Sequence, residues 1–189
     1  VMWDVISDAP QSTAHANARF FVPLLAKQMG LRGWALFTDV DVMFRGNVCR
    51  LFEQLDNSKA VYCVWHDHNP GDGVKMDGQV QSSYGRKNWS SVLAFNIEHE
   101  ANKALTLDVL NNTPGRDLHR LMWLADCDIG ELDGAWNYLI GHSDPEKSAT
   151  IAHFTSGTPD MDGYADQKYA DEWRAVRDGW ARGTLSFGS

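Results

Sequence analysis

The sequence predicts an α/β fold with helices flanking an open, parallel sheet, and three features predict it. Residues 34–47, WALFTDVDVMFRGN, form a short apolar run that stops at two aspartates. Two further runs, at residues 60–65 and 89–96, are rich in aromatic and branched side chains. Runs of this kind are typical of strands buried on both faces of a parallel sheet. Apolar residues at helical spacing in residues 14–30 and 170–180 predict the flanking helices.

The first run presents two carboxylates where its strand leaves the sheet. Side chains two residues apart on a strand point the same way, ~7 Å apart, so Asp39 and Asp41 aim at one place. Like charges this close repel unless one is protonated or a cation lies between them. Ligands of open α/β sheets bind at strand ends, which favours the cation. The alternative is a strand-terminal aspartate that only caps a turn.

Length and charge limit the class of protein. A chain of 189 residues is the size of one domain, so we expect a single domain over residues 1–189. A net charge of −8 argues against nucleic-acid binding. No run is long enough to span a bilayer. Three irregularly spaced cysteines fit neither a disulfide framework nor a zinc cluster, which indicates the cytoplasm. The eight tryptophans suit either core packing or stacking on sugars.

The remaining elements follow from local patterns. Ser12 and Thr13 could cap the helix at 14–30, in which Pro23 implies a bend or boundary. Residues 126–137 are interpreted as an acidic turn anchored by Trp136. Further helices are expected at residues 48–56, 100–111 and 118–125, and a last strand at 150–154. A closing helix is expected at 170–180, and its stripe of Trp173, Val176 and Trp180 is expected to face the core.

Two histidine-containing positions offer other chemistry. His66, Asp67 and His68 follow the strand at 60–65, and His at i and i+2 can ligate a metal, as in some phosphohydrolases. His153 lies inside the apolar strand at 150–154, where a histidine is more often a core residue than a ligand. The aspartate pair's need for a third ligand makes His153 a candidate.

The order of four segments resembles the metal-dependent glycosyltransferases of the GT-A fold, in particular the glycogenin-like and bacterial galactosyltransferase-like group. These segments are Asp39-Val40-Asp41, then WSSVLAFN at 89–96, LDGAWN at 132–137 and HFTSGTPDM at 153–161. The resemblance covers residues 12–164. The family's usual first strand has no counterpart, so we expect that an N-terminal piece is missing.

The resemblance implies a set of site residues. The metal ligands would be Asp39, Asp41 and His153, binding Mn²⁺ or Mg²⁺. Asp128, and after it Asp126, would lie over the reacting face of the sugar as the catalytic group. Nucleotide contacts are expected from Ser12, Arg19, Asp39 and Gly157, the last in a Gly-Thr-Pro-Asp segment that replaces the family's Lys-Pro-Trp form. The sugar and acceptor sites would involve Asn88, Trp89, Ser90, Trp136 and Asn137.

We therefore predict a cytoplasmic, bacterial-type glycosyltransferase that moves a hexose from a nucleotide diphosphate sugar, with UDP the expected nucleotide, to a sugar or glycan acceptor. One alternative is a metal-dependent phosphohydrolase built on His66, Asp67 and His68. Another is a non-catalytic carbohydrate-binding module that uses the tryptophans.

Overall fold

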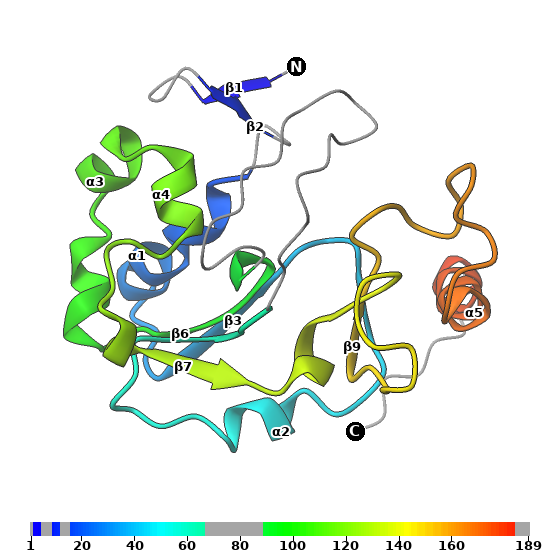
Figure 1. Ribbon diagram of the computed structural model, residues 1–189. Coiled ribbons are helices and arrows are strands. Elements are labelled where there is room, and N and C mark those ends of the chain that lie inside the picture. Colours follow the sequence, from blue (N-terminus) through cyan, green and yellow to red (C-terminus); the bar gives the residue numbers. More distant parts are fainter. Residues whose placement is uncertain (1, 5–8, 12–15, 67–88, 184–189) are drawn as a thin grey trace. The chain divides into compact units, whose positions relative to one another are not determined.

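The computed structural model describes residues 2–4, 9–11, 16–66 and 89–183. The chain forms two compact units (Figure 1). Unit 1 consists of Val1–Thr38 and Cys49–Gly134, and unit 2 of Asp39–Val48 and Ala135–Ser189. Each unit has its own sheet.

The sheet of unit 1 contains four strands in the order β3-β6-β5-β7. The two central strands, β5 (Val61–Val64) and β6 (Val92–Asn96), are fully buried, which explains their unbroken apolar sequences. β7 (Ile129–Leu132) pairs in parallel with β5, and the other pairings in this sheet are antiparallel. The sheet is therefore mixed, and the prediction of a parallel sheet was wrong.

The first apolar run forms β3 (Trp34–Thr38), but in a different setting from the one expected. β3 is an edge strand antiparallel to β6, and all five residues are only half-buried. An edge strand lacks one neighbour, so its side chains keep some contact with solvent. An apolar run gives the strand but not its direction or its place in the sheet.

Helices α1, α3 and α4 gather on one side of this sheet (Figure 1). Alternate strand residues face them, and Val61, Cys63, Leu93 and Phe95 share a core cluster with Phe20 and leucines of the helical region. The α-helices of this unit are α1 (Val22–Gln28), α2 (Cys49–Phe52), α3 (Leu107–Asn112) and α4 (Gly115–His119).

Three predicted helices have different bounds for local reasons. The helix expected at 14–30 has its α-helical part at Val22–Gln28, with Pro23 in the first turn, where proline is tolerated. The helix expected at 100–111 is broken before Thr106, which caps α3 by accepting from the Val109 N–H. The helix expected at 118–125 is wrong, because α4 ends at His119 and Leu121 has φ +55°.

Short elements complete the described chain. Residues 126–137, for which an acidic turn was one interpretation, contain β7, so the turn was wrong, whereas Trp136 is buried as that interpretation expected. None of the described helices is long and apolar enough to cross a membrane. The other described elements of unit 1 are the antiparallel pair β1 (Met2–Asp4) and β2 (Ala9–Gln11), and the 3₁₀ turns η1 (Ala18–Phe21), η2 (Trp89–Ser91), η3 (Glu100–Ala104) and η4 (Asp126–Asp128). A further 3₁₀ turn, η5 (Gly134–Asn137), begins at the last residue of unit 1 and continues into unit 2.

Unit 2 is built on a three-stranded sheet in the order β4-β9-β8. β4 (Val42–Phe44) is antiparallel to β9 (Ile151–His153), and β8 (Tyr138–Leu139) is parallel to β9. Its buried core includes Met43, Tyr138, Ala152 and Phe154.

The closing helix α5 (Ala170–Ala181) matches the predicted one. Trp173 packs against the core of unit 2, with its ring 6.5 Å from that of Phe154. Val176 and Trp180 are 44% and 73% exposed, so the prediction that the whole stripe faces the core was wrong. Helical spacing shows that residues share a face but not how far the core extends along it.

Candidate metal centre

Backbone pairing in unit 2 brings Asp41 beside His153. Val42 of β4 is the register partner of His153 in β9, and the Phe154 N–H donates to the Asp41 carbonyl at 2.9 Å. Asp39 lies two residues earlier. The intervening Val40 is fully exposed, whereas both aspartates are half-buried, and the segment makes a turn between β3 and β4.

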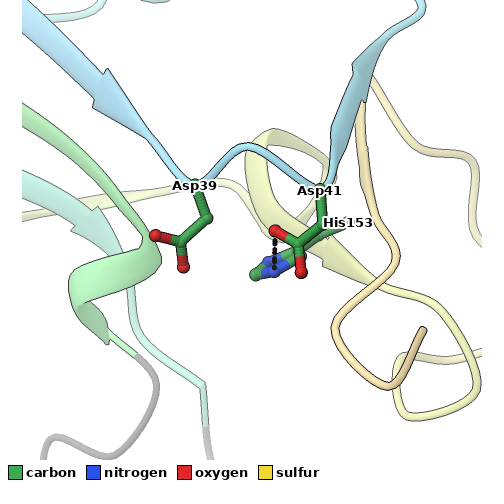
Figure 2. Close-up of side chains that lie close together, drawn as sticks. All are labelled: Asp39, Asp41 and His153. Atoms are coloured by element: carbon green, nitrogen blue, oxygen red, sulfur yellow. Dashed lines mark ion pairs between the residues drawn. The ribbon is translucent and has the colours of Figure 1, made fainter. Parts of the chain in front are cut away.

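The three side chains lie close together, with Asp41 next to His153 and Asp39 to one side of them (Figure 2). One ligand atom from each of Asp39, Asp41 and His153 lies within 4.8 Å of the others. Asp41 Oδ1 is 3.3 Å from His153 Nε2. In the described part of the chain, this is the one group of three His, Cys, Asp or Glu residues that could hold a metal ion.

The donor set of this centre fits a divalent cation. Two carboxylates and one imidazole suit Mn²⁺ or Mg²⁺, while the soft thiolates that select zinc are not part of the group. The His153 side chain is 4% exposed and that of Asp41 34% exposed. The protein thus provides ligand atoms on one side of the centre, and the other side is accessible to water or a ligand.

His153 makes a second contact behind the centre. Its Nδ1 lies 2.9 Å from Oδ1 of Asn137, whose side chain is fully buried. Trp136 is also buried, at 6% exposure. Neither residue presents an open face to a sugar in this conformation, so their predicted role in sugar binding gains no support from the geometry.

In unit 1, two predicted site residues come together. An Nη1 hydrogen of Arg19 is donated to the Ser90 carbonyl oxygen at 2.6 Å, and the guanidinium lies 5.0 Å from the centre of the Phe37 ring. Sequence reasoning missed His119, whose Nδ1 is 2.7 Å from Ser90 Oγ. Burial, with a smaller contribution from the charge of Arg19, lowers the His119 pKa to about 4. A single histidine at a helix end offers no pattern that would have revealed this contact.

The predicted catalytic acids also lie in unit 1. Asp126 and Asp128 belong to η4, which leads into the amino end of β7, and the Asp128 carbonyl accepts from the Ala60 N–H at the amino end of β5. Asp126 is exposed and Asp128 half-buried. Their catalytic role stays a prediction.

Gly157 in unit 2 has a clear backbone role. Its N–H donates to the Phe154 carbonyl, and its carbonyl accepts from Gln167. A Cβ atom at this position would come within 2.6 Å of the Tyr164 ring, so the loop requires glycine. Nucleotide binding by Gly157 stays a prediction.

Several predicted residues are not assessed by the structure. Ser12, Asn88, Asp67 and His68 lie outside the described residues, and so does the side chain of Trp89. His66 is described and half-buried. The structure therefore does not test the phosphohydrolase site of His66, Asp67 and His68, which stays a prediction.

Comparison with known proteins gives one sequence relative and two structural neighbours. No family model matches the chain. Protein CDI of Arabidopsis thaliana is 38% identical over 168 residues, which are 86% of this chain and 64% of that protein's length. This chain therefore spans less than two thirds of its relative.

Both structural neighbours are glycosyltransferases. GlyE of Streptococcus pneumoniae TIGR4 superposes with a TM-score of 0.55 at 12% identity, over 92% of this chain and 48% of GlyE. The bifunctional glycosyltransferase WbbM superposes with a TM-score of 0.54 at 13% identity, over 88% of this chain and 38% of WbbM. At these identities the likeness establishes the fold, and the predicted GT-A-like α/β class, with a sheet flanked by helices, is confirmed.

Proposed function

We propose that this chain carries the metal-binding part of a glycosyltransferase that uses a nucleotide diphosphate sugar, with UDP as the expected nucleotide. The observation that carries the proposal is the meeting of Asp39, Asp41 and His153 in a chain with the fold of GlyE and WbbM. The fold alone does not define an activity. The site chemistry adds what the fold lacks, because a divalent cation held there would stabilise the negative charge of a diphosphate leaving group.

The three ligands have distinct parts in this proposal. Asp39 and Asp41 supply the negative charge that attracts the ion to this place in the protein. His153 lies at the buried end of β9 and supplies a nitrogen donor, so it forms the inner side of the metal site. A bound Mn²⁺ or Mg²⁺ would neutralise charge that builds on the diphosphate as the glycosidic bond breaks.

The accessible side of the centre is the side on which a diphosphate would bind. The chain has a net charge of −8, so an unscreened anion would be repelled. Donor binding is therefore expected to depend on the metal. Transfer of a hexose, the glycogenin-like grouping and a glycan acceptor belong to the same proposal and rest on the sequence resemblance.

Isothermal titration tests the proposal directly. UDP is titrated into the protein with Mn²⁺, and again with EDTA. We expect binding in manganese and none in EDTA. Absence of UDP binding in the presence of Mn²⁺, by a version that spans the full length of the Arabidopsis relative, would contradict the proposal.

A pair of variants separates this centre from the phosphohydrolase alternative. Asp41→Ala is expected to abolish Mn²⁺ binding and His66→Ala to leave it intact. The opposite result would favour the alternative site.

A further inference from the structure

We propose that Asn137 is a positioning residue that fixes which ring nitrogen of His153 faces the metal centre. This inference deepens the proposed function and rests on it. Asn137 is one of the largest fully buried side chains in the described residues, with 0% exposure. A buried carboxamide needs hydrogen-bond partners, and Oδ1 of this one lies 2.9 Å from His153 Nδ1.

The chemistry of the contact determines the tautomer. A carboxamide oxygen only accepts hydrogen bonds, so Nδ1 of His153 must carry the ring hydrogen. A metal-bound imidazole is neutral, so a hydrogen on Nδ1 leaves the lone pair of Nε2 for the metal. Nε2 is the nitrogen 3.3 Å from Asp41 Oδ1. Asn137 thus orients the ring so that Nε2 faces the two carboxylates.

The sheet of unit 2 explains why this contact is well placed. β9 lies between β4 and β8, and His153 is paired with Val42 on one side and Leu139 on the other. Asp41 immediately precedes β4, and Asn137 immediately precedes β8. The Ile140 N–H also donates to the His153 carbonyl at 2.9 Å. Asn137 and Asp41 therefore lie at the starts of the two strands that flank β9, one beside each ring nitrogen of His153.

This role differs from the sugar contact suggested by the sequence. A fully buried side chain cannot touch a sugar, whereas it can orient a ligand from behind. Hydrogen bonds from ligand histidines to such partners set ring orientation, and their loss lowers metal affinity by roughly 10- to 100-fold.

The test compares three variants by Mn²⁺ titration, with folding checked by circular dichroism. Asn137→Leu removes the acceptor at similar volume and is expected to weaken Mn²⁺ binding roughly 10- to 100-fold. Asn137→Asp keeps an acceptor oxygen and is expected to restore most of the affinity. Asn102→Leu is the matched control, because Asn102 is also buried but its amide hydrogens are donated to the Ala60 and Asn96 carbonyls in unit 1. We expect the control to lose stability and keep Mn²⁺ affinity.

A second measurement reports the tautomer without metal. Long-range ¹H–¹⁵N correlation spectra of the metal-free protein identify the protonated nitrogen of His153. We expect a hydrogen on Nδ1 in the wild type and in Asn137→Asp, and its partial or complete loss from Nδ1 in Asn137→Leu. An Nδ1 without a hydrogen in the wild type, or unchanged Mn²⁺ affinity in a folded Asn137→Leu variant, would overturn the inference.

The two readouts separate this inference from the proposed function. If the wild type binds no Mn²⁺, the proposed function is contradicted, while the spectra still decide whether Asn137 orients His153. If Asn137→Leu does not fold, the wild-type spectrum alone decides: a hydrogen on Nδ1 supports the inference, and its absence refutes it.

Discussion

Asp39 and Asp41 place two negative charges side by side on a half-buried segment. Without a cation, their mutual repulsion offsets the contact that Asp41 makes with His153. Charged groups in such a position are present for binding more than for stability. Metal binding and folding stability should therefore respond differently to substitution of these aspartates.

For Asp41→Asn we predict loss of Mn²⁺ binding and of transferase activity, with the free energy of unfolding in EDTA changed by no more than about 0.5 kcal/mol. The amide keeps the shape of the side chain but removes a charged ligand. Titration with Mn²⁺ and thermal melts in EDTA measure the two effects. Asp162→Asn, which removes an exposed charge in unit 2, serves as control and should leave binding unchanged. A melting temperature that falls sharply for Asp41→Asn in EDTA would contradict the prediction.

His119 predicts a pH dependence in unit 1. Its pKa is about 4 in the folded state, against 6.5 for an unperturbed histidine, because burial and the charge of Arg19 disfavour the charged ring. Between these values the unfolded chain binds a proton that the folded chain does not. Folding stability should therefore fall as pH is lowered from 6.5 to 4, by up to about 3 kcal/mol from this group.

Urea unfolding at a series of pH values measures this contribution. Other histidines titrate in the same range, so the comparison is with His119→Gln, which can still hydrogen-bond Ser90 but does not titrate. We expect a shallower loss of stability in the variant between pH 6.5 and 4. Identical pH profiles would show that His119 has an ordinary pKa.

At the scale of elements, the Tyr62 ring of β5 lies over the neighbouring strand β7 at a position that carries no side chain. Gly130 in β7 is the register partner of Tyr62 in β5. A Cβ atom at Gly130 would lie 2.2 Å from the Tyr62 ring. That ring is also held by its hydroxyl, which accepts from the Asp56 N–H at 3.1 Å. The ring therefore has little freedom to move aside.

Gly130→Ala is predicted to destabilise the protein by about 1–3 kcal/mol, the usual cost of overpacking a core. Gly134→Ala is the matched control, because a Cβ there meets nothing within 4 Å and the residue has no positive φ. The control should change stability by no more than about 0.5 kcal/mol. Denaturant unfolding of both variants checks the pair, and equal stabilities would show that Tyr62 can move away.

The elements also show what the sequence could and could not predict. β5 and β6 were predicted because central strands are apolar throughout. β7 was missed because Gly130 and Glu131 interrupt its apolar residues, and an exposed glutamate between buried neighbours looks like part of an acidic turn. The early end of α4 depends on the positive φ of Leu121, which no composition rule predicts for a leucine.

The metal centre was easier to predict than the rest of the site. Asp39 and Asp41 are two residues apart at a strand end, which is a local pattern, and His153 was placed with them by resemblance. The contacts of Asn137 and His119 depend on strand register and side-chain burial, which a single sequence does not contain. This difference explains why the sequence grouped Asp39, Asp41 and His153, while it gave Asn137 a different role and did not single out His119.

At the scale of the whole molecule, all three proposed ligands belong to unit 2. Metal binding stabilises the folded state by about 2.7 kcal/mol when the free ion is at 100 times its Kd. We predict that Mn²⁺ slows amide hydrogen exchange in β4 and β9 more than in β5 and β6. Hydrogen exchange with mass spectrometry measures this difference.

Asp41→Asn provides the control for this experiment, since its exchange should not respond to Mn²⁺. Equal slowing in both sheets of the wild type would contradict the prediction and would show that the two units open together.

The ladder between β4 and β9 has one more consequence. The spacing of positions 41 and 153 is set by main-chain hydrogen bonds, which do not depend on the side chains attached there. Exchanging the imidazole for a carboxylate would give an all-oxygen centre suited to Mg²⁺ or Ca²⁺, and exchanging it for a thiolate would favour softer metals. The ion preference of the proposed centre is thus open to redesign by a single substitution that leaves the backbone pairing unchanged.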